Sequence, residues 1–345
     1  MGFNLKTNIK TSYITLLVLL LLVCNDVYNQ EFKKVSDLQG EWKFSIGDNS
    51  EWSSKDFKDQ EWDEILVPSS WENQGFHGYD GYAWYRKYFW IDARYTTMPL
   101  YLSLGYIDDV DEVYINGHLI GRTGTFPNDY TTAYDAKRHY RIPKNILYAN
   151  GENSIAVRVY DEGGEGGIIH GDIAIMVDID AIPVDYDLQG TWKFKTGDCK
   201  VVKNSEWNFS DWDEIIVPGI WENQGYKSYD GIASYAIEFN LSNEFDGVRM
   251  VLVLGKIDDL DQVYLNGKLI GQSGEFTKNT LYNNPESHQQ RRGYFLPVDA
   301  LNNKGKNVLI IKVLDAGGLG GLYKGSVGLI TQTHYIHYWR ARRKR

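Results

Sequence analysis

Acidic residues recur in the same order in two parts of the sequence, and paired carboxylates are the groups that glycoside hydrolysis uses. Glu72 and Asp80 have counterparts at Glu222 and Asp230. Hydrolysis needs two carboxyl groups several ångströms apart across a cleft. Acids of this kind also accept hydrogen bonds from backbone N–H groups in turns. Because both parts keep them, we favour the structural use. The other shared acids are Asp108 and Asp258, Asp109 and Asp259, and Asp111 and Asp261.

Three of the shared acids form an Asp-rich turn that could hold a metal ion. They are Asp108, Asp109 and Asp111. Hard cations such as Ca²⁺ bind clustered oxygen atoms, but the spacing does not match an EF-hand loop. We therefore expect no cofactor, and a structural calcium ion on this turn is the alternative that stays open.

Other residues differ between the two parts, which makes them better candidates for a binding or catalytic role. Histidine exchanges protons near neutral pH. Arginine pairs with a carboxylate or sulfate through parallel hydrogen bonds, and an aromatic ring offers a face to a sugar. Each residue taken singly is as easily a solvated loop side chain. Those found only in the first part are His77, Trp84, Arg86, His118, Arg122, His139, Arg141 and His170.

This set of side chains suits β-elimination from a uronic acid better than hydrolysis. Positive groups would neutralise the carboxylate and acidify the C5 proton, and a histidine or tyrosine would remove it. We expect His139 and His170 to be acid and base, with Tyr140 as the alternative. A shared site requires that the loops carrying these residues converge. The expected substrate-binding residues are Arg86, Arg122 and Arg141 for the carboxylate, and Trp84 and His77 for the sugar ring.

The acidic residues recur in the same order because the chain holds two copies of one unit. Residues 61–81 match residues 211–231 at 14 of 21 positions, and residues 104–121 match residues 254–271 at 13 of 18. Two copies of this length indicate tandem domains rather than a solenoid. The expected division is a signal peptide at 1–30, a first domain at 31–182, a second domain at 183–333, and a basic C-terminal tail at 334–345.

Each unit has the sequence pattern of β-strands. Val113–Ile120 places an Asn-Gly pair between two apolar runs, which is a strong hairpin signal, and Val263–Ile270 repeats it. No long stretch has a convincing helical period. The sequence therefore predicts an all-β protein of two tandem β-sandwich domains, each closed as a jelly roll.

Several motifs resemble those of a known sugar-binding module. They are the runs Trp71–Gly75, Tyr79–Gly81 and Ile107–Asp109, with the Asn-Gly turn that follows. Together they look like the galactose-binding-like jelly roll of family 2 glycoside hydrolases. The glycine-rich run Asp161–Gly167 resembles the jelly roll of sialate O-acetylesterases. The resemblance implies this fold and a carbohydrate context, but not the activities of the parent enzymes.

Charge and cysteine content argue against two other classes of protein. There are 36 basic and 46 acidic residues, and the net charge of −10 opposes binding to nucleic acid. Of the two cysteines, Cys24 lies in the expected leader and Cys199 is left without an intrachain partner. A disulfide framework is therefore excluded.

The N-terminus has the features of an export signal. Lys6 and Lys10 precede the apolar run Ile14–Val23, which is too short to cross a bilayer. We therefore expect an exported protein, periplasmic or secreted, without a membrane span. Lipidation at Cys24, as in an outer-membrane lipoprotein, is disfavoured because Val23 stands where a small residue is expected.

Two functions follow from these observations. The first is an exported carbohydrate-active enzyme, a polysaccharide lyase or oligosaccharide dehydratase, that forms a 4,5-unsaturated uronate by β-elimination. The alternative is a non-catalytic glycan-binding protein, in which two modules in series add avidity. Either function implies an oligosaccharide or polysaccharide partner, anionic if the arginines bind it.

Overall fold

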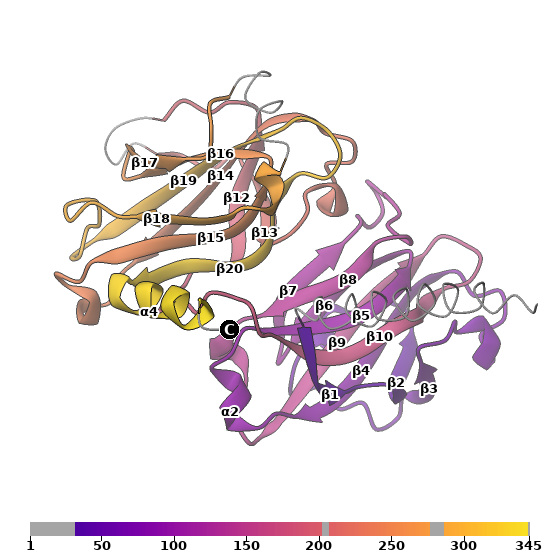
Figure 1. Ribbon diagram of the computed structural model, residues 1–345. Coiled ribbons are helices and arrows are strands. Elements are labelled where there is room, and N and C mark those ends of the chain that lie inside the picture. The colour runs from indigo at the N-terminus through magenta and orange to yellow at the C-terminus, as the bar shows by residue number, and fades with distance from the viewer. Residues whose placement is uncertain (1–31, 202–206, 277–285, 344–345) are drawn as a thin grey trace, which may run out of the picture.

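The computed structural model describes residues 32–201, 207–276 and 286–343. The expected signal peptide therefore lies outside the described residues. The described part is all-β apart from short helical segments, as the sequence predicted, and its strand pairs are all antiparallel. Figure 1 shows the first unit in indigo to magenta and the second in orange to yellow.

The first unit contains two sheets. The strands of the four-stranded sheet, in spatial order, are β1 (Phe32–Asp37), β10 (Gly167–Asp178), β5 (Leu100–Asp108) and β8 (Lys137–Ile142). Those of the six-stranded sheet are β3 (Asp63–Val67), β2 (Gly40–Ile46), β4 (Gly81–Trp90), β9 (Glu152–Asp161), β6 (Val110–Ile115) and β7 (His118–Thr123). Its short helical segments are η1 (Ser50–Ser53), η2 (Glu72–Gln74), α2 (Ala93–Thr96) and η3 (Lys144–Ile146).

The second unit repeats this arrangement. Its four-stranded sheet consists of β11 (Tyr186–Asp187), β20 (Gly321–Thr331), β15 (Met250–Asp258) and β18 (Arg291–Phe295). Its six-stranded sheet consists of β13 (Asp213–Val217), β12 (Gly190–Thr196), β14 (Gly231–Asn240), β19 (Lys306–Asp315), β16 (Leu260–Leu265) and β17 (Lys268–Gln272). Its helical segments are η4 (Glu222–Gln224), η5 (Asn243–Phe245), η6 (Ser287–Gln289) and α4 (Gln332–Arg342).

The prediction of two jelly-roll sandwiches was wrong. A jelly roll distributes eight strands over two sheets, whereas the described residues of each unit form ten strands, four in one sheet and six in the other. The difference arises at the edges of the larger sheets. There β3 pairs with β2, and β7 pairs with β6, so that hairpin partners extend each larger sheet to six strands.

The Asn-Gly hairpin is confirmed in both units. Asn116 and Gly117 both have positive φ angles, of 51° and 81°, between β6 and β7. Asn266 and Gly267 repeat them at 52° and 78° between β16 and β17. A two-residue turn with positive φ at both positions matches the twist of the strands that it joins.

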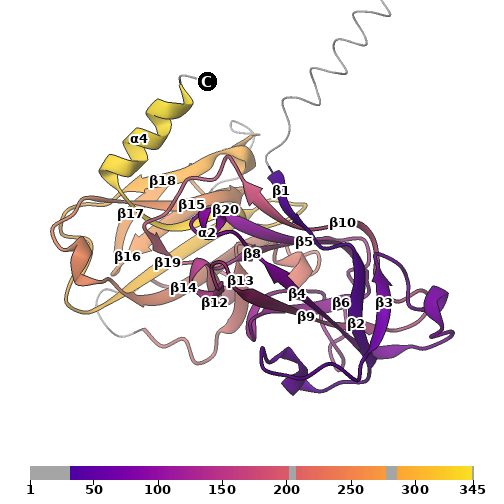
Figure 2. The same ribbon diagram turned by 90° about the horizontal axis from the view of Figure 1, so that it is seen from below.

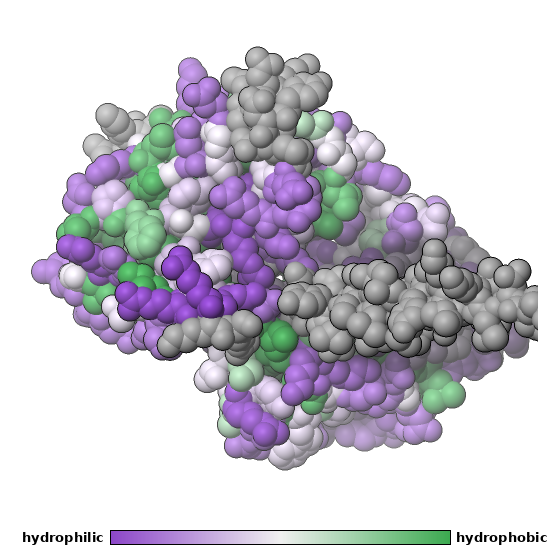
Figure 3. Space-filling view, viewed as in Figure 1, coloured by the Kyte–Doolittle hydropathy of each residue, from purple (hydrophilic) through white to green (hydrophobic). Residues whose placement is uncertain are grey.

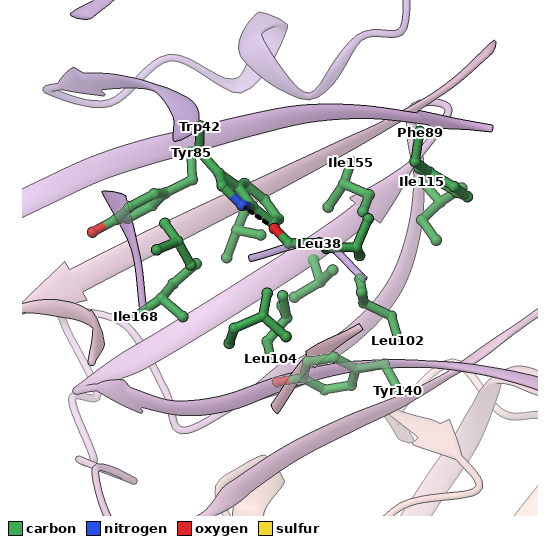
Figure 4. Packing of buried hydrophobic residues seen from close by; sticks show 14 of the residues in the cluster. Leu38, Trp42, Tyr85, Phe89, Leu102, Leu104, Ile115, Tyr140, Ile155 and Ile168 are labelled. Atoms are coloured by element: carbon green, nitrogen blue, oxygen red, sulfur yellow. Dashed lines mark hydrogen bonds between the residues drawn. The ribbon is translucent and has the colours of Figure 1, made fainter. Parts of the chain in front are cut away.

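The core of the first unit lies between its two sheets. Trp42 and Phe44 point inward from alternate positions of β2 and are 1% and 0% exposed. Both belong to one apolar cluster with Leu102 and Leu104 of the other sheet, and Figure 4 shows Trp42 and these two leucines within it. The indole N–H of Trp42 donates to the Leu38 carbonyl at 2.8 Å, so its polar atom is satisfied inside the core. Burying a large apolar side chain stabilises the fold by roughly 1.5–3 kcal/mol.

Helix α4 was not expected from the sequence. It begins at the Thr331 cap, whose side chain accepts from the His334 N–H. Tyr335, Tyr338 and Trp339 pack on a small apolar cluster formed by the linker, β15 and β20. Figures 1 and 2 both show α4 beside the four-stranded sheet of the second unit, and its visible face in Figure 3 is strongly hydrophilic. No helix within the described ranges is long and apolar enough to cross a membrane.

The two units contact each other directly. The Gly124 N–H after β7 donates to the Asn223 carbonyl of η4 at 2.7 Å. Lys144 Nζ donates to the Val184 carbonyl of the linker at 3.3 Å. The first bond places the end of β7 against η4, and β7 also lies near β13 of the second unit.

Candidate functional site

A cavity of 680 Å³ lies where the two units meet. The first unit contributes parts of β1, β5, β7, β8 and β10, and the second contributes the segment 218–224 and the start of β20. This volume is in the range of about 300–1,000 Å³ found for ligand sites. The polar and aromatic side chains in its described lining include Phe32, Lys34, Tyr101, Arg122, Lys137, His139, Asp172, Asn223, Tyr323 and Lys324.

His139 forms part of the apolar wall. Its ring stacks on Tyr101 with 4.7 Å between centroids, and the edge of Phe32 meets it at 4.3 Å. Burial, reinforced by Lys137 and Lys324, lowers the pKa of His139 to about 4. Its Nε2 atom is buried and finds no hydrogen-bond partner among the described residues. His139 is therefore a neutral ring at pH 7 with unmet hydrogen-bonding capacity.

The charged lining of the cavity is mostly positive. The described lining residues include a single carboxylate, that of Asp172, and five cationic side chains: Lys34, Arg122, Lys137, Arg141 and Lys324. Lys34 Nζ lies 3.8 Å from the Asp172 carboxylate, which neutralises one of these charges in part. The Nε atom of Arg122 is buried without a hydrogen-bond partner in the described part of the chain. Such a lining attracts anions, although the whole chain is acidic.

Tyr140 and Arg141 border the cavity but are bound by the protein itself. Tyr140 Oη donates to the Asp111 carboxylate at 2.5 Å, and burial followed by the charge of Asp111 holds its pKa well above the usual range. One Arg141 nitrogen donates to the carbonyls of Leu100 and Ile142 at 2.8 and 2.6 Å. Tyr140 is therefore not placed to exchange a proton with a ligand. Arg141, expected to bind a carboxylate, keeps a buried Nε atom without a hydrogen-bond partner among the described residues.

Two of the expected site residues are buried on the six-stranded sheet, away from the cavity. Arg86 is 1% exposed and forms an ion pair with Asp59 at 2.8 Å. Trp84 is fully buried, and its indole N–H donates to Asp48 at 3.1 Å. Both serve the packing of β4.

The other two residues, His77 and His170, are exposed and do not line the cavity. The ring of His170 lies against Tyr106 with 4.5 Å between centroids. Of the eight residues expected to form one site, the structure brings Arg122, His139, Tyr140 and Arg141 to the cavity. The expected acid and base, His139 and His170, are not brought together there.

Comparing the two copies within the sequence did not reveal that the second unit contributes residues to the cavity. Lys324 occupies the position that corresponds to His170, and it is Lys324 that lines the cavity. Asn223 belongs to the motif that both units share, yet only this copy faces the cavity. Comparing the two copies did single out the position of His170 and Lys324 as different. It could not show which of the two copies faces the other unit.

The structure supports the scaffold use of the shared acid at position 72. A Glu72 carboxylate oxygen accepts from the Gly166 N–H at 3.1 Å, and Glu222 accepts from the Gly320 N–H at 2.9 Å. Each acid therefore binds the glycine-rich loop of its own unit.

Two clusters of side chains have the geometry to hold a metal ion. Carboxylate oxygens of Asp108, Asp109 and Asp161 lie within 4.8 Å of one another, and so do ligand atoms of Asp258, Asp259 and His288. Neither cluster belongs to the lining of the cavity.

Comparison with known families finds a match within the first unit. Residues 47–165 match the family described as the second all-beta domain of beta-galactosidase. The first unit therefore contains an all-β domain similar to those of family 2 glycoside hydrolases, which confirms the resemblance at this level.

The curated relatives are much longer than this chain. A putative beta-glucuronidase of Formosa agariphila is 27% identical over 168 residues, which cover 44% of this chain and 16% of that protein. A beta-galactosidase of Thermoanaerobacter pseudethanolicus is 26% identical over 132 residues, covering 37% of this chain and 17% of that protein. The match thus spans about a sixth of the length of these relatives.

Two solved structures are among those similar to this chain. A beta-glucuronidase from glycoside hydrolase family 2 is 12% identical, with a TM-score of 0.36 and coverage of 87% of this chain and 30% of that one. A family 2 member from Bacteroides cellulosilyticus is 17% identical, with a TM-score of 0.35 and coverage of 81% and 31%.

The prediction of a β-eliminating carbon–oxygen lyase was wrong. The curated relatives described above are named as hydrolases of glycosides, not as lyases. The geometry agrees with this correction. His170 lies outside the cavity and Tyr140 is bound to Asp111 in the core, so the proton-transfer groups that elimination requires are not assembled.

Proposed function

We propose that the protein binds an anionic glycan in the cavity between its two units and serves glycoside breakdown as a binding component. The observation that carries the proposal is the charge of the lining, where five lysine and arginine side chains accompany one carboxylate in a chain of net charge −10. A uronic acid residue supplies a carboxylate that such a lining attracts, and arginine binds carboxylates through directed hydrogen bonds.

The rings in the cavity complement its charges. Phe32, Tyr101 and His139 form a continuous aromatic group at one wall. Such rings offer apolar surface to the C–H face of a sugar, while lysine, arginine and asparagine groups reach its hydroxyls and carboxylate. The name of one relative, putative beta-glucuronidase, is consistent with a uronic acid glycoside.

The lining favours binding over hydrolysis. A glycosidase needs two carboxyl groups on opposite sides of the scissile bond. Among the described residues that line the cavity, Asp172 is the only acid, and it lies beside Lys34 at 3.8 Å. The apolar run at 14–23 supports the further proposal that the protein meets its glycan outside the cytoplasm.

Calorimetric titration with tetragalacturonate and with neutral galactotetraose tests this function. We expect saturable binding of the uronate and at least tenfold weaker binding of the neutral sugar. Arg122→Gln and Lys324→Gln should each weaken uronate binding about tenfold, because a hydrogen bond to a charged group contributes about 1.5 kcal/mol.

Lys268→Gln is the matched control, since Lys268 lies on β17 and pairs with Asp299 outside the cavity. Equal affinity for the two sugars, or equal loss in the control, would contradict the proposal. Release of nitrophenol from 4-nitrophenyl β-D-glucuronide by the purified protein would contradict a role limited to binding.

A further inference from the structure

We propose that the cavity takes an oligouronate through two ionised carboxylates of the same chain, one bound beside Arg122 and the other beside Lys137. This inference rests on the proposed function, because it specifies which anionic glycan the same cavity would bind. It follows from the course of the cavity, which passes around one edge of the first unit, from the outer face of one sheet to the outer face of the other.

The cavity lies along two edge strands, one from each sheet of the first unit. β7 is the last strand of the six-stranded sheet and β8 is the last strand of the four-stranded sheet, and the two strands contact each other. A side chain in place of Gly121 on β7 would overlap the ring of Tyr140 on β8. The core-facing sides of the two strands are therefore in direct contact, so a ligand must pass around this edge rather than between the strands.

The cations on these strands point to opposite sides of the edge, because side chains alternate along a strand. Arg122 lies opposite Glu112 in the β6–β7 register, on the outer face of the six-stranded sheet. Lys137 precedes the buried Arg138, which binds Asp111 in the core, so Lys137 belongs to the outer face of the four-stranded sheet. Packed sheets are about 10 Å apart, and the two charges are separated by at least about this distance.

The described part of the protein leaves both cations without a counter-ion. Arg122 is half-buried and forms no ion pair or hydrogen bond with the described residues, and Lys137 is exposed and likewise unpaired there. A half-buried guanidinium has lost part of its hydration. A carboxylate of the ligand would restore that interaction through charge-assisted hydrogen bonds.

The acids closest to Arg122 are already held by other cations. Glu112 pairs with Arg158 at 3.3 Å, and Glu214 pairs with Lys193 at 2.9 Å. The hydrogen bond from Lys193 is the main cause of the lowered pKa of Glu214, and the charge of Arg122 is a lesser one. Arg122 is therefore available to an acid group that enters the cavity.

The second unit adds a polar group at each end of the cavity. At the Arg122 end, Asn223 is held against the first unit by the Gly124 N–H, which donates to its carbonyl at 2.7 Å. At the Lys137 end, Lys324 Nζ lies 5.4 Å from the centre of the Phe32 ring. A sugar that stacks on the aromatic wall therefore meets lysines, and only a ligand longer than one sugar ring also reaches Arg122.

The second unit lacks both ends of this arrangement. Gln272 stands at the position of Arg122. The outer face of its four-stranded sheet is apolar at Val251 and Val253, and the rings of α4 pack on it. The pair of separated charges is therefore specific to the first unit.

Calorimetric titration of the full chain with two tetrasaccharides of equal length tests the inference. One is tetragalacturonate, and the other is tetragalacturonate that is methyl-esterified at three of its four carboxylates. We expect the esterified sugar to bind at least about tenfold more weakly, because it can neutralise only one end of the cavity. Its single carboxylate should bind at the lysine end, where the positive charge is greater.

Two substitutions separate the ends. Arg122→Gln introduces the side chain that the second unit carries at this position, so the fold accommodates it. It should weaken tetragalacturonate about tenfold and the esterified sugar less than about twofold. Lys137→Gln should weaken both sugars by about fivefold or more, and the double variant should show the product of the two losses for tetragalacturonate, since distant sites act independently.

Lys268→Gln, outside the cavity, is again the control and should change neither affinity. Equal affinities for the two sugars, or an equal loss of both in Arg122→Gln, would overturn the second carboxylate while the proposed glycan site remained. Binding of neither sugar would contradict the proposed function together with this inference.

Discussion

The two units share a buried frame but differ where they meet. In the first unit, Asp111 accepts from Arg138 at 2.7 Å and from Tyr140 at 2.5 Å. The second unit repeats these bonds with Asp261, Arg292 and Tyr294 at 2.8 and 2.5 Å. This network of one aspartate, one arginine and one tyrosine is the buried frame of each unit. It joins β6 to β8 and β16 to β18, and so links the larger sheet of each unit to the smaller one. Residues kept in both copies therefore belong mainly to the frame.

The contact between the units uses the copies unequally. η4 of the second unit lies against β7 of the first, while its counterpart η2 takes no part in the cavity. Likewise Lys324 lines the cavity and its counterpart His170 does not. Whether a duplicated loop lines the cavity thus depends on which part of the other unit it contacts. The residues that differ between the copies can therefore be assigned to the cavity only once the packing of the units is known.

The largest expected effect tests whether the two frames are equivalent. Asp111→Ala and Asp261→Ala each leave a buried arginine without its partner, which costs about 3–5 kcal/mol. Urea denaturation should show a comparable loss for both variants. Lys43→Ala removes an exposed partner of Glu64 and should cost less than about 1 kcal/mol. A large loss in one unit and a small loss in the other would show that the frames are not equivalent.

A smaller effect separates the two copies of one position. Lys324→Glu reverses a charge in the cavity and should weaken binding of tetragalacturonate by about tenfold or more, because charge complementarity governs such contacts. His170→Glu places the same charge at the corresponding exposed position and should leave the affinity within about twofold. Calorimetry on both variants measures the difference, and equal losses would place the glycan elsewhere.

The smallest effect concerns pH. Because burial lowers the pKa of His139 to about 4 from 6.5, the unfolded chain binds a proton there more readily than the folded one. The stability that this group contributes is complete above about pH 6.5 and is lost as the pH falls towards 4. The melting temperature should fall over this interval by about 2–4 °C more in the unaltered protein than in His139→Phe.

His77→Gln is the control for the pH experiment, since His77 is exposed and lies outside the cavity. Its melting profile should follow that of the unaltered protein. Parallel profiles for all three proteins would show that His139 is protonated in the folded state as easily as in the unfolded one.

Local signals predicted local structure well. The Asn-Gly turns predicted a hairpin in each unit, and the structure has both. The number of strands in a sheet was not predictable in this way, because short edge strands such as β3 and β7 are defined by their pairing. Helix α4 was missed because its apolar side chains, Tyr335, Tyr338 and Trp339, occupy one short basic segment.

The candidate site was predicted only in part. Residue type indicated Arg122 as a ligand for a carboxylate and His139 as an acid or base, and both line the cavity. Residue type could not distinguish these two residues from Arg86, which forms an ion pair with Asp59 inside the protein. It also could not supply Lys324, which reaches the cavity through the packing of one unit on the other.

Hydrogen–deuterium exchange with and without tetragalacturonate tests the central claim, that both units form the walls of one glycan site. The account predicts slower exchange on binding at residues 137–141 of the first unit together with residues 219–224 and 321–324 of the second. Protection confined to one unit, or to the outer face of a six-stranded sheet, would contradict it.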